Sequence, residues 1–304
     1  MKNILYLSLL CGVLAACSDD VTKINTTTEA IRIVGSIGAE TTTRAVGNTW
    51  NNTDQIGVSG SGKGNVLYST TSATTTATFT STTPIYYTSP ASYYDAYYPY
   101  HSSPTTNTAA STVFSVTTGP TQNASETTRK AIDVLWAKTS STVAASSNVT
   151  FAFAHMLSEL VITFDWSGTG FGSAPTSWDF TIGSVYQSAT VTINHTQLSS
   201  GNWSVPSCTV AASESASAYT VSGWDTNTYT MIVPAQDLSA HTFSVTVSGI
   251  TYSGSLPASF SLTQGNKSTV TIKVSKTGLN VTSADVSAWG NGAEANSGSI
   301  SATI

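Results

Sequence analysis

The side chains best suited to acid–base or metal chemistry are thinly spread along the chain. Its four histidines stand singly, and no pair has the HxH or HExxH spacing that sets two metal ligands on one face. Acidic residues are mostly isolated, and CxxC, GxSxG and phosphate-binding glycine motifs are absent. We therefore expect no enzyme, no metal site and no cofactor. The histidines are His101, His155, His195 and His241.

The beginning of the chain has the layout of an export signal. Lys2 supplies a short positive region, residues 4–14 form an apolar stretch, and the sequence L-A-A-C ends at Cys17. The apolar stretch is shorter than the roughly 20 residues that cross a bilayer, as in secretory signals. The L-A-A-C pattern resembles the lipobox of bacterial lipoproteins, which implies cleavage before Cys17 and acylation of its thiol. The alternative is an ordinary signal peptide that ends near a cysteine.

The remaining cysteine content limits how the body can be held together. Cys11 leaves with the signal and Cys17 is acylated, so Cys208 is the one thiol expected in the folded body. A single thiol forms no intramolecular disulfide, and stability must come from a hydrophobic core. The acidic residues 18–20 resemble a signal that directs some lipoproteins to the outer face of the outer membrane.

Composition and periodicity indicate the class of fold. Only 9% of residues are charged, against a usual value of about 25%, and the net charge of -5 argues against nucleic acid as a partner. Alternating runs are frequent, such as residues 242–250, where Phe243, Val245 and Val247 share one face of a half-buried strand. Candidate strands recur from Ile56 onward between turn residues. This rhythm predicts an all-β sandwich architecture.

A division of the body follows from local composition. Residues 30–38 read as one isolated strand within a polar, threonine-rich segment, and a glycine- and serine-rich stretch at 167–175 is typical of a linker. The predicted divisions are a signal peptide at 1–17, an N-terminal segment at 18–44, an N-terminal domain at 45–167 and a C-terminal domain at 168–304.

One apolar run predicts a break in a strand. Alternate residues from 151 to 157 share one face, whereas those from 160 to 166 share the opposite parity. A bulge or strand break near residues 158–159 must shift the register. We expect His155 to be a hydrogen-bonded core histidine at that junction, in preference to a ligand.

Seven of the thirteen tyrosines lie between residues 85 and 101. They could form an aromatic platform for a sugar or a partner surface, or they could pack in strands; we favour packing, with phenol groups reaching solvent. Farther along, residues 264–267 (QGNK) are typical of a hairpin turn between the runs 258–262 and 268–274.

The order of several segments resembles the fimbrillin-like family of bacterial pilus subunits and related surface proteins. The similarity runs from the lipobox nearly to the C-terminus. It rests on Arg44-Ala45, WNNTDQIGV (50–58), YYDAYYPYH (93–101), DVLWA (133–137), FAFAHMLSELVI (151–162) and the Gly-Asn-Lys turn before STVTIKV.

The resemblance implies two transthyretin-like β-sandwich domains in an outer-membrane surface lipoprotein. An arginine-specific protease would cut between Arg44 and Ala45, releasing the first strand and opening a groove. A donor strand from another pilus subunit would fill that groove, and here the candidate donor carries Ile300, Ala302 and Ile304 on one face. The protein would be a structural or tip subunit serving adhesion to a host or bacterial surface ligand. It would meet a membrane only through the precursor's lipid anchor.

An alternative function stays open at this point. The chain could be a non-polymerising outer-membrane surface lipoprotein that binds glycans through exposed aromatic side chains. It would then keep its N-terminal segment and lose sugar affinity when those side chains are replaced.

Overall fold

A computed structural model describes residues 29–38, 49–167, 170–195, 205–212, 214–289 and 299–300. Within these ranges the chain is almost entirely β, with one short α-helix, α1 (Glu126–Lys130), and one 3-10 helix, η1 (Pro120–Asn123). The predicted all-β class is confirmed. No helix in the described part is long and apolar enough to cross a bilayer. The predicted sites Cys17, Arg44, Ala45, Ala302 and Ile304 lie outside the described residues.

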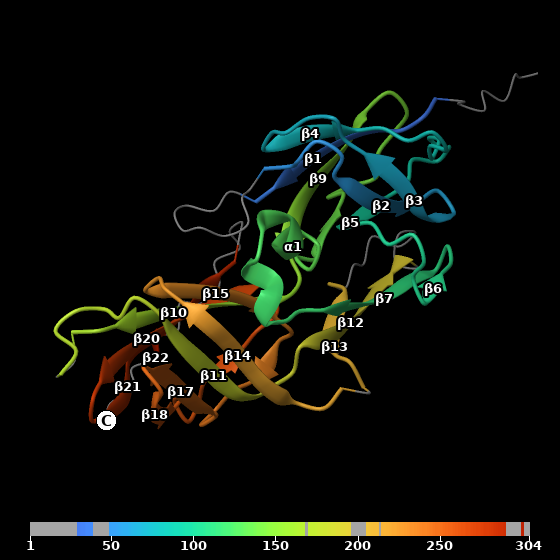
Figure 1. Cartoon of the computed structure of the whole chain (residues 1–304). Coiled ribbons are helices and arrows are strands. Elements are labelled where there is room, and N and C mark those ends of the chain that lie inside the picture. The colour runs from blue at the N-terminus through green and yellow to red at the C-terminus, as the bar shows by residue number, and fades with distance from the viewer. Residues whose placement is uncertain are drawn as a thin grey trace, which may run out of the picture.

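The N-terminal half forms one seven-stranded sheet, drawn in blue to green in Figure 1. All of its neighbouring strands run antiparallel except β1 and β9, which are parallel. Ser69 at the end of β3 and Thr80, directly after β4, exchange two 2.9 Å backbone hydrogen bonds, so the outermost strands meet and the sheet closes on itself. In spatial order the strands are β3 (Lys63–Ser69), β2 (Gln55–Gly60), β5 (Tyr94–Tyr98), β8 (Leu135–Lys138), β9 (Asn148–His155), β1 (Arg32–Ile37) and β4 (Thr76–Phe79).

Aromatic side chains fill the interior of this closed sheet. Trp50 is fully buried and meets Phe79, Tyr98 and Phe153 edge to face, with ring centroids 5.0, 5.5 and 5.2 Å away. Such perpendicular arrangements are favoured because the positive edge of one ring faces the negative face of another. The interior is therefore a packed aromatic core.

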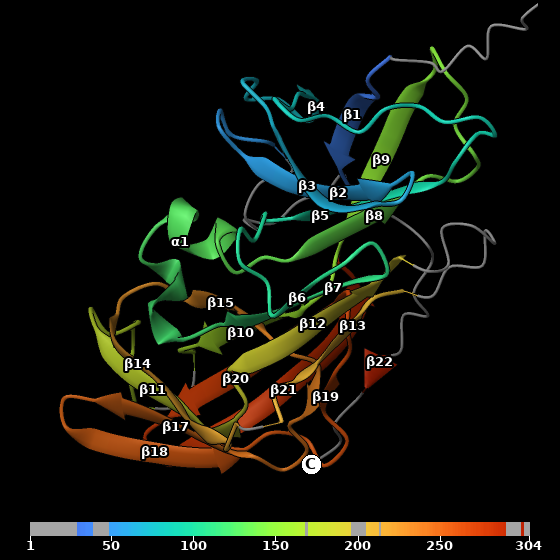
Figure 2. The same ribbon diagram turned by 90° about the vertical axis from the view of Figure 1, so that its right-hand side faces the viewer.

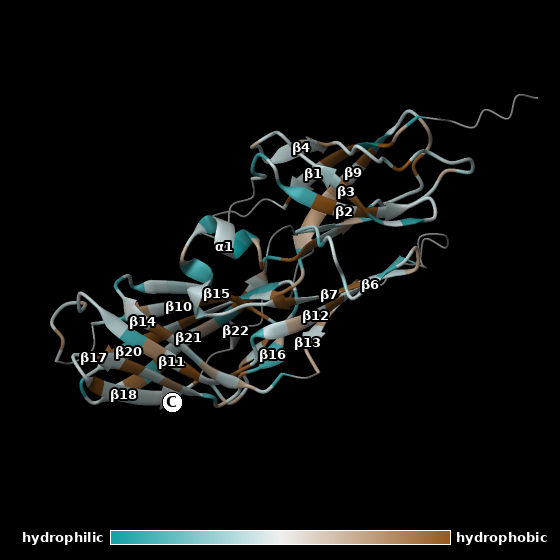
Figure 3. Ribbon diagram, turned by 45° about the vertical axis from the view of Figure 1, so that its right-hand side comes forward, coloured by the Kyte–Doolittle hydropathy of each residue, from teal (hydrophilic) through white to brown (hydrophobic). Residues whose placement is uncertain are grey.

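The C-terminal half is a sandwich of two sheets, seen in the lower part of Figure 2. Alternate residues of the longer strands point into one shared core, and the brown stripes in Figure 3 follow that alternation. The first sheet has the order β15 (Thr228–Val233), β10 (Ser158–Asp165), β20 (Asn266–Ser275), β21 (Gly278–Ala288) and β22 (Ser299–Ile300). The second has the order β14 (Ser217–Trp224), β11 (Trp178–Val185), β17 (Thr242–Val247) and β18 (Ile250–Ser255).

A smaller sheet lies between the two larger units (Figure 2). It combines β7 from the first half of the chain with β12 from the second, paired from Ser111 to Thr117 against Ser188 to Asn194. Its order is β13 (Ser207–Val210), β12 (Ser188–Asn194), β7 (Ser111–Thr117) and β6 (Thr106–Asn107). A two-stranded sheet of β16 (Gln236–Asp237) and β19 (Ser261–Leu262) completes the fold.

The helix η1 lies along β15, the outer strand of the first C-terminal sheet. The Gln122 side-chain amide accepts a 2.5 Å hydrogen bond from the Ile232 N–H and donates a 3.2 Å bond to the Ile232 carbonyl. Asn123 Nδ2 donates to the Thr230 carbonyl at 2.8 Å. Two side-chain amides thus occupy backbone groups that a neighbouring strand would otherwise use.

The predicted strand break is confirmed. β9 ends at His155 in the N-terminal sheet, and β10 begins at Ser158 in the C-terminal sandwich. The change of parity therefore marks a passage from one sheet to another, ahead of the expected boundary at 167. The division into 45–167 and 168–304 as independent domains, and their transthyretin-like type, stay predictions.

The predicted hairpin around residues 264–267 is wrong. The turn is present, with Gly265 at a φ of 72°, but β20 after it pairs with β10 and β21. The strand before it, β19, pairs with β16. The residues at 264–267 therefore predicted the turn correctly, but they did not predict which strands pair with each other.

Candidate functional site

β1 lies inside the N-terminal sheet between two strands that are distant from it in sequence. Arg32–Ile37 pairs in parallel with Asn148–Phe153 of β9. On its other edge, Ile33–Ser36 pairs antiparallel with Thr76–Phe79 of β4. Since β1 is hydrogen-bonded on both edges, its removal would open a gap between β9 and β4.

The inner face of β1 supplies part of the N-terminal core. Ile31 and Ile33 are 4% and 0% exposed, and the partly buried Ile37 packs against the same core. These side chains and Gly35 follow the period of two that places alternate residues on one face of a strand. The sequence-predicted strand at 30–38 is thereby confirmed.

Gly35 sits where no larger residue fits without adjustment. A Cβ atom there would lie 3.0 Å from Phe79 Cε2 and 3.1 Å from Phe153 Cε2. Its carbonyl accepts a 2.9 Å hydrogen bond from Trp50 Nε1. The inner face of β1 therefore alternates large, small and large side chains. Trp50, at the centre of the core, is hydrogen-bonded to the middle residue of the strand, Gly35.

The beginning of β1 is fixed by a second set of contacts. The Ile31 N–H donates to the Ile85 carbonyl at 2.9 Å, and the Arg32 N–H donates to Tyr87 Oη at 3.2 Å. The Arg32 side chain is half exposed, donates to the Ser146 carbonyl and lies 3.5 Å from Glu29. Most of this anchoring uses backbone groups, so it depends little on the identity of the strand's side chains.

A cavity of about 400 Å³ opens beside β1. Its lining includes Ile31, Ile33, Phe79 and Tyr68. Tyr68 Oη accepts a 2.8 Å hydrogen bond from the Ile85 N–H, and burial raises the pKa of Tyr68 to about 12. The first residues of β1 thus border this cavity.

The other predicted strand, at the C-terminus, is only partly described. Ser299 and Ile300 form β22, paired with Asp285 and Ala284 of β21 in the C-terminal sandwich. Cys17, Arg44 and the rest of the C-terminal segment belong to the undescribed residues. Arg44 falls in the link between Gly38 and Thr49, which joins β1 to the remainder of its own sheet.

The tyrosine cluster serves mainly as packing. Tyr87, Tyr94, Tyr97 and Tyr98 are buried, and Tyr86 is 49% exposed. The hydroxyl groups end on protein partners, such as Asn65 for Tyr97 at 2.6 Å. The expectation of packing is confirmed, although these phenols bond internally where we expected them to reach solvent.

His155 is the buried, hydrogen-bonded core histidine that the sequence predicts. Its Nδ1 lies 2.8 Å from Asp133 Oδ1, and its ring stacks on Trp289 at a centroid distance of 3.8 Å. The stacking partner comes from the end of the C-terminal sandwich. His155 therefore helps to join the two halves of the molecule.

Sequence reasoning missed a second buried cluster, around His195. Its Nδ1 lies 3.0 Å from Asp95 Oδ2, and its Nε2 lies 3.2 Å from Ser59 Oγ and 2.9 Å from Thr112 Oγ1. Serine, histidine and aspartate in this order resemble a hydrolytic triad, but these three residues are 1%, 3% and 1% exposed. Separations of 100 and 136 residues leave no motif to find. The cluster ties the N-terminal sheet to the small central sheet.

The other described histidine, cysteine and acidic side chains form no cluster, and the one described thiol is buried. In the part of the chain that the structure describes, no three His, Cys, Asp or Glu side chains gather to hold a metal ion. Cys208 is buried in β13, and burial raises the pKa of its thiol to about 12. A thiol that stays protonated is a poor nucleophile.

Comparisons with known proteins place this geometry in context. A family model described as fimbrillin-like matches residues 43–289. The solved structure of a candidate cell adhesion protein from Bacteroides uniformis aligns with a TM-score of 0.65 and 23% identity, covering 86% of this chain and 99% of the other. A candidate cell adhesion protein from Bacteroides ovatus aligns with a TM-score of 0.65 and 20% identity, covering 87% and 99%. None of the curated proteins matches the sequence.

Proposed function

Since the chain belongs to the fimbrillin-like family, we propose that it is a structural or tip subunit of a bacterial surface pilus that serves adhesion. Family membership supports a pilus-subunit or adhesion role, outside the cell and without catalysis. The finer proposal is that the subunit is exported as an outer-membrane lipoprotein and assembled by protease-triggered donor-strand exchange. The observation that carries it is the position of β1, an internal strand joined to its sheet through the link that contains Arg44.

Processing would act on that link. Arg44 is the one charged residue in positions 41–50, so an arginine-specific protease would meet a single cleavage point between Arg44 and Ala45. Cleavage cuts the covalent connection of β1 to the sheet but leaves its hydrogen bonds. Each buried isoleucine contributes about 1.5–3 kcal/mol, so release of β1 would be slow until another strand competes for its place.

The candidate donor strand matches the inner face of β1. The C-terminus carries Ile300, Ala302 and Ile304 at alternate positions, a large, small, large pattern. The inner face of β1 carries Ile33, Gly35 and Ile37. Alanine in the position of Gly35 would require the Phe79 and Phe153 rings to move by a few tenths of an ångström. Backbone bonds to β9 and β4 would give the affinity, and this alternation would give the register.

The anchor completes the pathway. Acyl chains on Cys17 would hold the precursor at the membrane, because more than one chain gives stable anchoring. Cleavage after Arg44 would then separate the subunit from Cys17 and its lipid, together with residues 18–44. The proposed partners are other pilus subunits, an arginine-specific protease, and a host or bacterial surface ligand.

The proposal is tested by proteolysis of the precursor. Residues 18–304 with Cys17 removed are incubated with an arginine-specific protease, and N-terminal sequence and oligomer size are followed together. A new N-terminus at Ala45 with ladder formation is expected for a structural subunit, and cleavage without assembly for a tip subunit. An Arg44→Gln variant should stay intact and monomeric. Resistance at Arg44 with cleavage at Arg32 or Arg129 would refute the processing step.

A second variant isolates the strand exchange. Ala302→Leu leaves the cleavage point unchanged but places a branched side chain opposite the Phe79 and Phe153 rings. If the wild type assembles, we expect this variant to be cleaved at the same rate and to form far fewer oligomers. Equal assembly by both proteins would show that Ala302 does not enter the position of Gly35.

A further inference from the structure

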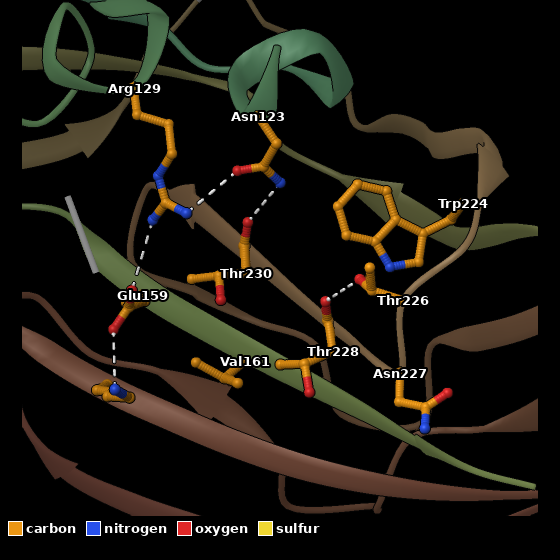
Figure 4. A pocket seen from close by; sticks show the side chains of 10 residues that line it. Asn123, Arg129, Glu159, Val161, Trp224, Thr226, Asn227, Thr228 and Thr230 are labelled. Atoms are coloured by element: carbon orange, nitrogen blue, oxygen red, sulfur yellow. Dashed lines mark hydrogen bonds and ion pairs between the residues drawn. The ribbon is translucent and has the colours of Figure 1, made fainter. Parts of the chain in front are cut away.

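A second, larger cavity lies in the C-terminal sandwich, away from β1. It has a volume of about 620 Å³, within the range of small-ligand pockets. Its floor is the outer face of β10 and β15, where Val161, Thr228 and Thr230 alternate with side chains that point into the core. The η1 and α1 segment forms one wall, and the turn before β15 forms the opposite one (Figure 4).

One wall carries a fixed group of charges. Arg129 Nη1 donates to Asn123 Oδ1 at 3.1 Å, and Asn123 is itself held by its bond to the Thr230 carbonyl. Arg129 Nη2 and Lys267 Nζ each lie 3.5 Å from an oxygen of Glu159, whose side chain is 1% exposed. These groups come from three separate elements and are positioned before any ligand arrives, which lowers the entropy cost of binding.

The charge balance of this wall favours an anion. Arg129 and Lys267 face one carboxylate, Glu159, so cations outnumber anions two to one among the lining residues. Distances of 3.5 Å exceed the 2.7–2.9 Å typical of charge-assisted hydrogen bonds. Arg129 Nε is buried and has no hydrogen-bond acceptor among the described residues. Two cations beside one carboxylate favour an anionic ligand in this cavity.

Positively charged residues such as Arg129 and Lys267 are rare in this chain. From residue 158 to 289 the sequence contains three lysines, Lys267, Lys273 and Lys276, and no arginine. Arg129 reaches the same cavity from the other half of the chain. The positive wall is therefore a local feature in a protein of net charge -5.

The opposite wall is aromatic. Trp224 ends β14 with its ring half buried, and it meets Tyr229 edge to face at a centroid distance of 4.8 Å. Figure 4 shows its indole ring across the cavity from Arg129. Its Nε1 also has no acceptor among the described residues. A held indole ring suits stacking against the C–H face of a sugar ring, and the nearby Asn227 and Thr226 suit hydroxyl groups.

We propose that this cavity binds an anionic saccharide, a pyranose ring that carries a carboxylate. The ring stacks on Trp224, the carboxylate meets Arg129 and Lys267, and the hydroxyl groups bond to Asn227, Thr228 and Thr230. This inference rests on the proposed adhesive role and gives the chemical class of the adhesion ligand. The exposed tyrosine, Tyr86, lies in the other half of the molecule and takes no part.

Binding is tested on the uncleaved monomer, residues 18–304 with Cys17 removed. Isothermal titration compares methyl β-D-glucuronide, methyl β-D-glucoside and acetate. We expect the glucuronide to bind with a Kd of about 1 mM and the other two at least about tenfold more weakly. Binding should weaken in 1 M salt, where charges are screened within about 3 Å. Equal affinity for glucoside or for acetate, or no binding by the glucuronide, would overturn the proposal.

Variants locate the site. Trp224→Ala should weaken glucuronide binding at least about tenfold, by analogy with other aromatic stacking contacts. Arg129→Lys should reduce the ratio of glucuronide affinity to glucoside affinity. Tyr86→Ala, the matched exposed aromatic, should bind like wild type. Thermal unfolding confirms that each variant is folded, and Trp224→Phe should retain part of the affinity if Trp224→Ala is unstable. Equal loss in the Trp224 and Tyr86 variants would refute the site.

The two proposals fail separately. A monomer that binds the glucuronide but resists cleavage at Arg44 leaves the saccharide site standing and refutes the processing step. A protein that assembles but binds no glucuronide leaves the pilus role standing and refutes the saccharide site.

Discussion

The two large cores of the molecule take their side chains from the chain in different ways. Every buried member of the C-terminal core comes from residues 160–284. The N-terminal core takes Ile33 from β1, Ile31 from just before it, and the others from residues 50–153, with the Arg44 link between the two groups. Both cores are aromatic and closely packed, so composition does not distinguish them. The N-terminal core depends on a strand that one backbone cut can detach.

The strongest test of whether the two cores unfold independently is a charged residue placed in β1. Ile33→Asp places a carboxylate at a position with 0% exposure, and we expect a loss of more than about 4 kcal/mol of unfolding free energy. Hydrogen exchange should show loss of protection in β4 and β9 while β10 and β20 stay protected. Simultaneous loss in all four strands would show that the halves unfold as one unit.

A smaller change in the same position sharpens the comparison. Ile33→Ala should lower the free energy of unfolding by about 2–5 kcal/mol, because it removes buried methyl groups and leaves a cavity. The matched control is Ile250→Ala in β18, where the side chain is 59% exposed and the change should be within about 0.5 kcal/mol. Urea denaturation measures both. Similar losses at the two sites would contradict the central role of β1.

Alkaline pH should weaken the N-terminal core through Tyr68. Burial raises the pKa of Tyr68 from 10.0 to about 12, so the folded state keeps a proton that the unfolded state releases first. The stabilisation is complete below pH 10 and is lost as pH rises from 10 to 12, with a slope of at most about 1.4 kcal/mol per pH unit. Denaturation of Tyr68→Phe should show a shallower pH dependence over that interval. An unchanged slope would exclude Tyr68 as a contributor.

The smallest effect is expected at the exposed start of β1. Arg32→Ala removes a side chain that is 52% exposed and 3.5 Å from Glu29. Exposed ion pairs contribute about 0–1 kcal/mol, and the backbone bonds to Ile85 and Tyr87 remain. Urea denaturation at low and high salt should therefore give nearly equal stabilities for variant and wild type. A loss above 2 kcal/mol would mean that the strand is held by its arginine more than by its backbone.

Local patterns predicted the elements better than their partners. The alternation of Ile31 and Ile33 predicted β1, and the parity change after His155 predicted the break before β10. Neither pattern could show that β1 would lie between β9 and β4, because the partners are up to 116 residues away in sequence. The same limit explains the wrong hairpin at residues 264–267, where a true turn joins strands that pair elsewhere.

The candidate sites show the same difference between local patterns and contacts made by distant residues. The predicted signal, the single arginine at position 44 and the C-terminal alternation are local patterns that a sequence displays directly. The Arg129 and Lys267 cavity and the His195 cluster depend on residues about 100 or more positions apart, and no spacing indicates them. The sequence also could not show that the tyrosine hydroxyl groups would bond inside the protein. They do so because β5 is covered on both faces by separate cores.

The amide side chains along β15 have a consequence for how subunits of the proposed pilus could join. Gln122 and Asn123 already bond the backbone of Ile232 and Thr230, so this edge cannot recruit a strand from a passing chain. If the vacated place of β1 is the entry point for a foreign strand, each subunit accepts one neighbour there and offers one tail. A chain of such units has two unlike ends and stays unbranched.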